Sequence, residues 1–445
     1  MNGIKIELSK SIRVIIVLLI SFISLKAFAY SLPERNIRDN IEKSIAQLEE
    51  ESVYPKPFYN IDSEAFVGQR LDNYTDAIFL DAAYIQSEIP LFKAVFGDFV
   101  MGGKGNNPVE RLSDAIQRKQ IGEEVGTYDY SRQWFGGEVI LRTLLMFFTY
   151  PQIRIVMQVS AIVLLVMGCL SLLKNIGINA MWAYLIGILC INPIIAASSF
   201  NLANGLFVTL VSSIIISRFG GNKSDIAIML AIGGCTSYFD LFAAPFLTYT
   251  VCVQVFLMKK LKQEEMNWKT SFFYLVKVSM GWVIGYLLCW SVKWLLASLA
   301  LDRNLFQEAL NEMVLYTSEY RPSWGPETNS ELIKEALKLN IINLFPINIM
   351  YENPTSRIFF LVTGTVLLLI RIGRNKSLNL NINYYIYILA AMAPYVWYIV
   401  VHVHSYVHFW FQYRLQAGTI IGIIFVCLEL TETTKAKIAE GKNKN

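Results

Sequence analysis

The residues best suited to chemistry lie near the end of the chain, where its three histidines, His402, His404 and His408, precede Arg414. His404 and His408 are four residues apart and would share a helical face, as some zinc-ligand pairs do. No HExxH signature accompanies them, and His402 has the wrong helical phase, so we expect no metal. Arg414 suits phosphate because its guanidinium is planar, and His404, His408 and Tyr406 could add contacts. The stretch therefore indicates a phosphate-binding wall or an aromatic anchor at a membrane surface.

Three aspartates form a second candidate group, Asp72, Asp76 and Asp81. On a helix Asp72 and Asp76 would share a face, whereas Asp81 differs in phase. A carboxylate held in a partly buried position can act as a general base. The alternatives are a solvated helix face, or a helix cap made by Asp72 or Thr75. We expect Asp76, and after it Asp72, to be the catalytic acid.

Arg132, Trp134 and Arg142 form a third group. Apolar residues recur at helical spacing from Val139 to Phe148, with Arg142 off this stripe, which predicts a helix lying in the membrane interface. Arginines in such a helix commonly anchor it to lipid head groups. The density of arginine, tryptophan, glycine and glutamate around them also suits a substrate-binding role, since arginine often recognises phosphate.

Asp240 is an acid inside a long apolar run. An acid at membrane depth is costly unless it is paired or hydrated, which makes it a candidate site residue. It could orient a nearby cation such as Lys293. The other interpretation is a turn at the membrane surface, where the carboxylate stays in water.

The composition of the whole chain indicates a membrane protein. Its 445 residues are 54% apolar and 17% charged, and the mean hydropathy is +0.42, values typical of a polytopic membrane protein. The net charge of +4 is too small to suggest a nucleic-acid-binding surface. All six cysteines fall inside apolar runs, so neither disulfides nor a cysteine metal site is expected.

The apolar runs predict an all-α protein with about ten transmembrane helices, each near the length that a bilayer requires. The expected spans are residues 14–29, 155–173, 178–197, 202–216, 226–238, 241–258, 272–296, 358–370, 384–401 and 415–428. Basic residues then fall mostly on one side, which by the positive-inside rule is cytoplasmic. The three candidate groups and Asp240 then share the exported side.

This topology divides the chain into a series of regions. Residues 1–29 form a first span or a signal-like segment, because the run is short and ends in an Ala-Phe-Ala sequence. The others are a large extracytoplasmic loop with interfacial helices (30–152), transmembrane helices (153–299), a second extracytoplasmic loop (300–356), C-terminal transmembrane helices (357–430) and a cytoplasmic tail (431–445).

Four short motifs give the chain a family resemblance: Tyr74–Ile78, Trp134–Arg142, Thr236–Asp240 and His404–Trp410. They resemble patterns in bacterial membrane proteins associated with surface polysaccharide, and the polytopic architecture with its large first exported loop resembles the GT-C superfamily of membrane glycosyltransferases. Members of that superfamily often place an acidic pair soon after the first span. Here the stretch that follows Ala29 is basic and mixed in charge, and the first aspartates are Asp39, Asp62, Asp72 and Asp76.

The resemblance implies an enzyme of the bacterial cytoplasmic membrane, with its site facing the periplasm or exterior. It would transfer a sugar from a polyprenyl-phosphate-linked donor to a glycan, lipid or protein acceptor. Asp76 or Asp72 would be the base, and substrate-binding residues would be Arg414, His404, His408, Arg142, Arg132, Asp240, Trp134 and Tyr406. No cofactor or metal is implied, and partners besides donor and acceptor would be membrane lipids, not nucleic acid. A flippase for lipid-linked sugars and a polysaccharide polymerase or ligase are the alternatives.

Overall fold

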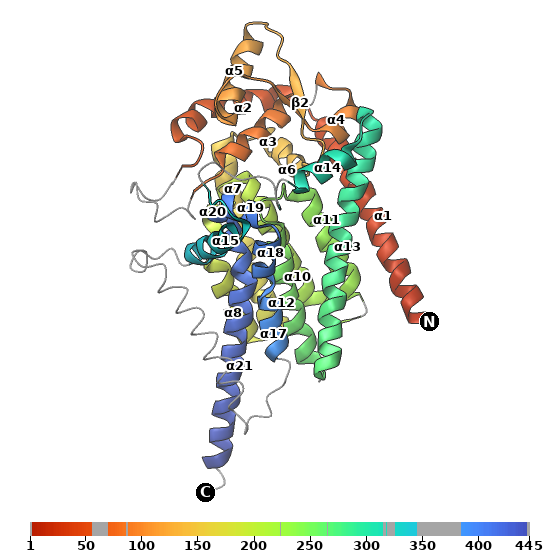
Figure 1. The fold of residues 1–445 in the computed structure, drawn as a ribbon, viewed down its shortest axis with the longest axis vertical. Helices are drawn as coiled ribbons and strands as arrows, with labels where there is room; N and C mark the ends of the chain where they lie inside the picture. The colour runs from red at the N-terminus through yellow and green to blue at the C-terminus, as the bar shows by residue number, and fades with distance from the viewer. Residues whose placement is uncertain are drawn as a thin grey trace.

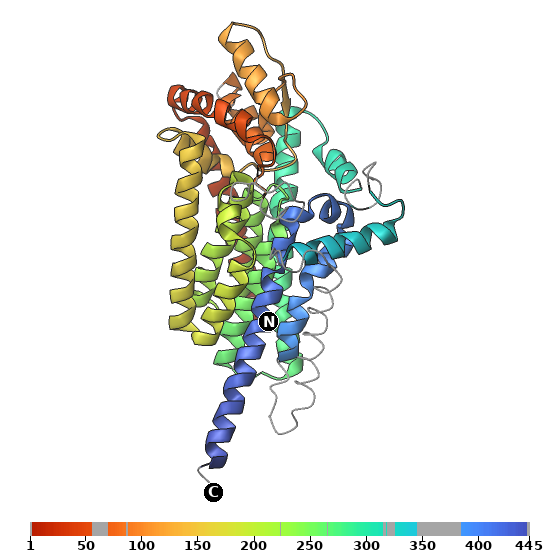
Figure 2. The same ribbon diagram turned by 90° about the vertical axis from the view of Figure 1, so that its left-hand side faces the viewer.

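The computed structural model describes residues 2–55, 70–85, 88–222, 224–264, 266–314, 317, 325–344 and 384–442. Helices dominate this part of the chain and form two layers. One is a bundle of long apolar helices, and the other is a group of shorter helices that covers one end of the bundle (Figure 1). We call the second group the capping layer. Figure 2 shows the same two layers from the side, with both chain termini away from the capping layer.

Five helices in the described ranges are long and apolar enough to cross a membrane: Ser9–Tyr30, Tyr150–Asn175, Phe200–Phe219, Trp268–Leu301 and Phe409–Leu430. They correspond to α1 (Asn2–Tyr30), α7 (Tyr150–Asn175), α10 (Phe200–Phe219), α13 (Trp268–Leu301), and the run of α20 (Phe409–Gln412), η5 (Tyr413–Gln416) and α21 (Ala417–Lys442). An all-helical, membrane-embedded architecture therefore fits the structure.

The predicted count of ten spans is not confirmed. The run 178–197 is divided into α8 (Ile178–Leu189) and α9 (Pro193–Ala197), because Asn192 adopts a left-handed conformation ahead of Pro193. The helix α11 (Asp225–Phe239) is also shorter than a full span, and the run 384–401 is divided into α17 (Tyr384–Ala391) and α18 (Ala393–Val400). The run 241–258 forms α12 (Pro245–Gln263), which ends in a lysine-rich turn. The expected span 358–370 lies outside the described residues.

The outer surface of the bundle is apolar. Large side chains on α1, α7 and α13 are exposed, among them Ile16, Ile155, Leu170, Phe273 and Leu299. An apolar surface of this extent suits contact with lipid chains, because soluble proteins rarely expose contiguous apolar patches of this kind. This apolar surface lies on the long helices, which agrees with their assignment as membrane spans.

Inside the bundle, α11 and α13 approach each other closely because glycines replace larger side chains. A β-carbon at Gly233 would lie 2.1 Å from the carbonyl oxygen of Trp282, and one at Gly285 would lie 2.0 Å from that of Leu230. Small residues allow membrane helices to pack backbone to backbone. This contact fixes α13 and, with it, the side chains at its end near the capping layer.

The capping layer contains α2 (Glu34–Glu51), α3 (Asn73–Ile85), α4 (Leu91–Gly97), α5 (Pro108–Gln120), α6 (Gly137–Leu145) and a two-stranded antiparallel sheet. The strands are β1 (Phe99–Met101) and β2 (Thr127–Asp129), with Val100 opposite Tyr128. These helices have their own core, to which α2 contributes Ile37, Ile41, Ile45 and Leu48 at helical spacing.

Three further helices complete the described chain beside the capping layer. These are α14 (Leu305–Val314), α15 (Asn329–Asn343) and α19 (His402–Val407). The small cluster of Leu332, Ala336, Val403 and Tyr406 joins α15 to α19. Asn340 adds a hydrogen bond from its side-chain amide to the carbonyl oxygen of Ser405, at 2.9 Å. The histidine-containing stretch is therefore held in place by the second predicted loop.

Candidate functional site

A cavity of about 820 Å³ lies where the capping layer meets the bundle. Its walls come from the start of α3, the segment 130–135, the α11–α12 turn, α13, α14 and the helices α18 to α20. This size is within the range of small-molecule sites in proteins. The cavity therefore brings together segments from both predicted loops and from the spans.

Aromatic side chains make up much of the wall of this cavity: Tyr54, Tyr74, Tyr130, Phe135, Phe242, Tyr286, Trp290, Trp294, Trp397, Trp410 and Phe411. The end of α13 near the capping layer supplies a continuous part of this wall. The ring centroids of Tyr286 and Trp290 are 5.2 Å apart, and those of Trp290 and Trp294 are 5.4 Å apart. The indole N–H of Trp294 donates to the carbonyl oxygen of Arg132 at 2.9 Å, which fixes that ring.

Four of the ten predicted site residues line the cavity: Asp72, Arg132, His404 and His408. They come from segments far apart in the sequence, as the predicted topology requires. Arg132 is the one cationic side chain among the described lining residues, and it pairs with Glu312 of α14 at 3.0 Å. The cavity thus combines an aromatic wall with a small number of polar groups.

The carboxylate of Asp72 stands at the start of α3 and is also the helix cap that the sequence allowed. One oxygen accepts the backbone N–H of Thr75 at 3.2 Å, and the other accepts the side-chain amide of Asn201 at 2.9 Å. Burial raises the pKa of Asp72 above its ordinary value, and these hydrogen bonds oppose the shift. A buried carboxylate beside a cavity, with a raised pKa, has the properties of a general base.

The carboxylate of Asp76 is buried and does not line the cavity. It accepts hydrogen bonds from the hydroxyls of Tyr150 and Ser199 and from the backbone N–H groups of Phe200 and Asn201. It therefore caps the N-terminus of α10, where a negative charge is favourable. Burial, followed by the charge of Asp72, raises the pKa of Asp76 to about 7.

Asn201 connects the two aspartates. Its side-chain amide donates to Asp72, and its backbone N–H donates to Asp76 at 2.8 Å. Both carboxylates are thus attached to the first turn of α10, but only Asp72 borders the cavity. The geometry favours Asp72 as the acid that can reach a bound molecule and Asp76 as the residue that positions α10 against α3.

The two cavity histidines are neutral near pH 7. Burial, and then the neighbouring His408, lowers the pKa of His404 well below its ordinary value, and burial lowers that of His408 to about 4. Nε2 of His404 lies 2.9 Å from the carbonyl oxygen of Phe242, so this nitrogen carries the proton. The rings of His404 and His408 are 4.6 Å apart, and His408 stacks on Phe411. They can contribute polar contacts but no full positive charge.

Arg414, predicted to hold phosphate, is buried outside the cavity wall. Its Nε donates to the carbonyl oxygen of Ile191 at 3.2 Å, and its guanidinium lies over the ring of Tyr413. Tyr406 is also absent from the wall and packs against α15. These two residues hold the α19–α21 region against its neighbours.

Arg142 and Trp134 are both buried in contacts between elements. The Arg142 guanidinium donates to the carbonyl oxygens of Ala29, at 2.9 Å, and Ala83, so it ties α6 to the ends of α1 and α3. Although it lies off the apolar stripe of its helix, Arg142 is therefore neither an exposed lipid anchor nor part of the cavity wall. Trp134 donates its indole N–H to the carbonyl oxygen of Cys289 at 2.9 Å and fixes the capping layer to α13.

Asp240 lies in the turn between α11 and α12, as one of its two interpretations allowed, but its carboxylate is buried and is not in water. Its carboxylate accepts the backbone N–H of Ala244 at 3.1 Å, and burial raises its pKa to about 7. Its neighbours Leu241, Phe242 and Ala243 line the cavity, but Asp240 does not. The suggestion that it orients Lys293 is wrong, because Lys293 pairs with a different carboxylate.

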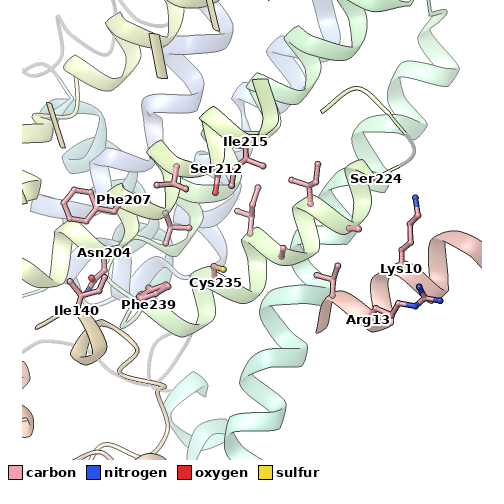
Figure 3. Close-up of a pocket in the computed structure, with 17 residues that line it drawn as sticks. Lys10, Arg13, Ile140, Asn204, Phe207, Ser212, Ile215, Ser224, Cys235 and Phe239 are labelled. Atoms are coloured by element: carbon pink, nitrogen blue, oxygen red, sulfur yellow. The ribbon is translucent and has the colours of Figure 1, made fainter. Parts of the chain in front are cut away.

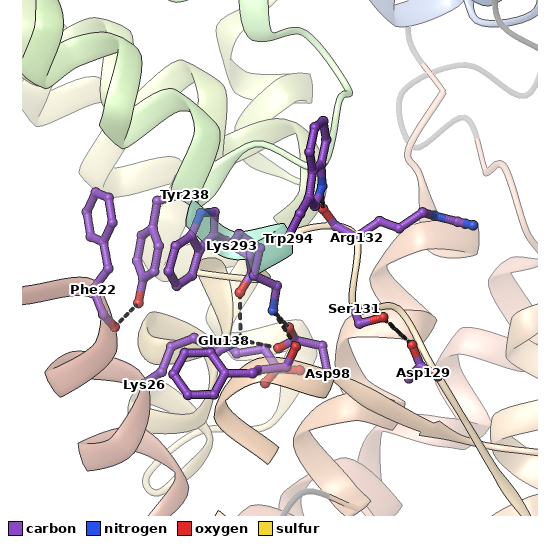
Figure 4. Close-up of polar contacts among 12 residues, drawn as sticks. Phe22, Lys26, Asp98, Asp129, Ser131, Arg132, Glu138, Tyr238, Lys293 and Trp294 are labelled. Carbon is purple, nitrogen blue, oxygen red and sulfur yellow. Dashed lines mark hydrogen bonds and ion pairs between the residues drawn. The ribbon is translucent and has the colours of Figure 1, made fainter. Parts of the chain in front are cut away.

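That carboxylate is Asp98, which lies between two lysines from different spans (Figure 4). Lys293 of α13 donates to it at 2.6 Å, and Lys26 of α1 forms a second ion pair with it. The hydroxyl of Tyr30 donates to both Asp98, at 3.0 Å, and Glu138. We call Lys26, Asp98 and Lys293 the ionic clamp, because it holds two spans to the capping layer.

Sequence reasoning missed several of these residues. Tyr286, Trp290 and Trp294 follow at i, i+4 and i+8 near the end of α13, a spacing that indicates one helical face. This spacing alone would have predicted an aromatic face on the helix. The pairing of Arg132 with Glu312 and the role of Asn201 depend on how α10 and α14 dock, and no local pattern indicates them.

The described residues contain no group of three or more histidine, cysteine, aspartate or glutamate side chains that could hold a metal ion. Comparisons of the chain with family models, with curated proteins and with solved structures give no match. Its function must therefore be inferred from the site itself.

Proposed function

We propose that this protein is a membrane glycosyltransferase that uses a polyprenyl-phosphate-linked sugar and acts in the aromatic cavity, on the extracytoplasmic face. The observation that supports this most strongly is the combination of an aromatic wall with a buried carboxylate, Asp72, at the junction of the two layers. A lipid-linked substrate could reach such a place with its chain in the bilayer and its sugar beside the capping layer.

The aromatic wall suits a sugar ring. Pyranose rings have apolar faces formed by C–H groups, and these pack favourably on the faces of tryptophan and tyrosine, whose rings are electron-rich. Tyr286, Trp290 and Trp294 offer successive rings along one side of the cavity. Polar groups at a few positions would then fix the orientation of the hydroxyls.

The reaction would begin with removal of a proton from an acceptor hydroxyl by Asp72. The acceptor oxygen forms a bond to the anomeric carbon while the bond from that carbon to the phosphate oxygen breaks. The polyprenyl phosphate leaves with the electron pair of that bond. Arg132 supplies positive charge on the cavity wall, and the N–H of neutral His408 can donate to a phosphate oxygen.

A flippase for lipid-linked sugars is the second candidate, because the helices around the cavity are interrupted. The helical conformation is interrupted between α17 and α18 and between α18 and α19, and it changes to a 3-10 turn at η5 before α21. Interrupted helices beside a binding site are common in transporters. A flippase would bind the same lipid-linked sugar without needing a base.

The Asp72→Asn variant distinguishes the two candidates. In a glycosyltransferase it should lower the rate of sugar transfer by about 10² to 10⁴ fold, the usual contribution of a general base. The measurement is release of polyprenyl phosphate by purified protein supplied with polyprenyl-phosphate sugars, together with the surface-glycan composition of cells that carry only the variant.

Asp39→Asn, which changes an exposed aspartate on α2, is the matched control and should retain full activity. Full transfer activity in Asp72→Asn would exclude Asp72 as the base. Translocation of the lipid-linked sugar without release of polyprenyl phosphate would favour the flippase.

A further inference from the structure

A long apolar groove runs along the outside of the bundle between α1, α10 and α11 (Figure 3). Its volume is about 690 Å³, and it follows α11 from Ser224 at one end of this helix to Phe239 at the other. The 15 residues of α11 span about 22 Å at 1.5 Å per residue. One leaflet is about half of a ~30 Å hydrocarbon core, so the groove is long enough for a lipid chain.

The walls of the groove suit such a chain. The lining residues of α10 are mostly apolar, including Phe207, Val211 and Ile215, and Val211 and Ile215 are exposed at the surface. On α11, Ala227 and Ala231 line the groove, and their small side chains leave its floor open. The groove therefore opens toward the region where membrane lipid would lie.

One end of the groove is positively charged. Lys10 and Arg13 of α1 border it, as Figure 3 shows, and both side chains are exposed. In the described part of the chain, no carboxylate forms an ion pair with either of them. This end lies at the side of the bundle away from the capping layer (Figure 1).

We propose that the groove binds an anionic phospholipid. Its phosphate would contact Lys10 and Arg13, and one acyl chain would lie along α11. Two cations beside an apolar channel match the charge and shape of such a lipid, whereas a zwitterionic lipid would neutralise them less well. The site shares no lining residue with the aromatic cavity, so the proposal does not depend on the proposed enzymatic function.

The test is native mass spectrometry of the purified protein after incubation with equal amounts of phosphatidylglycerol and phosphatidylcholine that carry the same acyl chains. The wild type should retain more phosphatidylglycerol. The double variant Lys10→Gln/Arg13→Gln should lower the ratio of the two bound lipids by about thirtyfold, given the contribution of each cation near an anionic lipid. The matched control is Lys269→Gln/Lys277→Gln, which removes two exposed cations of α13 outside the groove and should keep the ratio.

A second measurement determines where the acyl chain of the bound lipid lies. Phosphatidylglycerol with a photoreactive acyl chain should label peptides of α10 and α11 in the wild-type protein, and Ala231→Trp, which fills the groove, should reduce that labelling. An unchanged lipid ratio in Lys10→Gln/Arg13→Gln, or an equal loss in the control, would overturn the proposal. Labelling confined to helices that do not line the groove, such as α7 or α13, would also contradict it, because the acyl chain would then lie elsewhere on the bundle.

Discussion

At the scale of single residues, the two aspartates of α3 show how neighbouring carboxylates acquire different roles. Both are attached to Asn201, and both are buried. Asp76 has its oxygens occupied by three donors at the start of α10 and by the hydroxyl of Tyr150 at the start of α7, whereas Asp72 borders the cavity. The sequence correctly indicates that they share a helical face. It cannot indicate which one borders the cavity, because that depends on how α3 and α10 dock against the rest of the protein.

The proposed role of Asp72 predicts a shift in the pH dependence of sugar transfer. A general base must be deprotonated, so activity should fall as the pH decreases through the pKa of Asp72. Burial raises this pKa, and the acidic limb should therefore lie above the value of about 4 that is typical of a free aspartate. The measurement is the rate of transfer against pH. An acidic limb at or below pH 4 would contradict the assignment.

The Asp76→Asn variant should affect stability. An asparagine replaces one acceptor oxygen by an amide that cannot accept the bonds now made to Asp76, so unfolding should become easier by about 1–3 kcal/mol. The pKa of Asp76 is raised to about 7 by burial and by Asp72. Its contribution to stability is therefore present below about pH 4 and is lost as the pH rises through 7.

Thermal unfolding in detergent at pH 5 and pH 8 measures both the stability lost in Asp76→Asn and the pH dependence of the contribution of Asp76. The variant should unfold at a lower temperature and should show a smaller difference between the two pH values than the wild type. An Asp76→Asn protein with wild-type stability and no transfer activity would instead indicate a direct catalytic role for this residue.

At the scale of elements, the ionic clamp shows what sequence patterns do not resolve. Lys26 and Lys293 are recognisable as charges inside apolar helices, and such charges need partners. Their partner, Asp98, follows α4 in the capping layer, far from either lysine in sequence. The spacing of the aromatic residues predicts the aromatic face of α13. The pairing of Asp98 with the two lysines cannot be predicted in this way, because it forms only when α1, α4 and α13 come together.

Removal of the shared carboxylate should destabilise the protein strongly. Asp98→Asn leaves two fully buried lysines without this counter-ion, at a cost of about 3–5 kcal/mol. The triple variant Lys26→Met/Asp98→Asn/Lys293→Met removes the charges together and should recover most of that loss. Thermal unfolding and the fraction of monodisperse protein after extraction are the measurements.

Glu264→Gln provides the control for this series. It breaks an exposed ion pair with Lys260 and should change the stability by no more than about 1 kcal/mol. If Asp98→Asn behaved like Glu264→Gln, the clamp would have no role in joining the layers.

At the scale of the whole molecule, basic residues gather at the end of the bundle that is opposite the capping layer. Lys174, Arg218, Lys260 and Lys262 lie near the ends of α7, α10 and α12, and α13 begins beside Lys269. These helix ends lie at the side of the bundle away from the capping layer (Figure 1). The sequence predicted this separation from hydropathy and charge. The count of ten full spans is not confirmed, and hydropathy does not register the helix breaks at Asn192 and after Ala391.

The separation predicts the orientation of the protein. By the positive-inside rule the basic side is cytoplasmic and the capping layer is exported. A cysteine introduced at Glu124, an exposed position after α5, should react with a membrane-impermeant thiol reagent in intact cells. A cysteine at Gln263, an exposed position at the end of α12, should react only after permeabilisation.

The wild-type protein is the blank for this labelling, since its six cysteines are buried or partly buried. The reverse pattern would place the aromatic cavity on the cytoplasmic side of the membrane. A donor displayed on the outer face could not then reach Asp72, so this result would remove the basis for an extracytoplasmic glycosyltransferase. The lipid groove would still be tested independently, because its preference for an anionic head group depends on Lys10 and Arg13 and not on which leaflet they face.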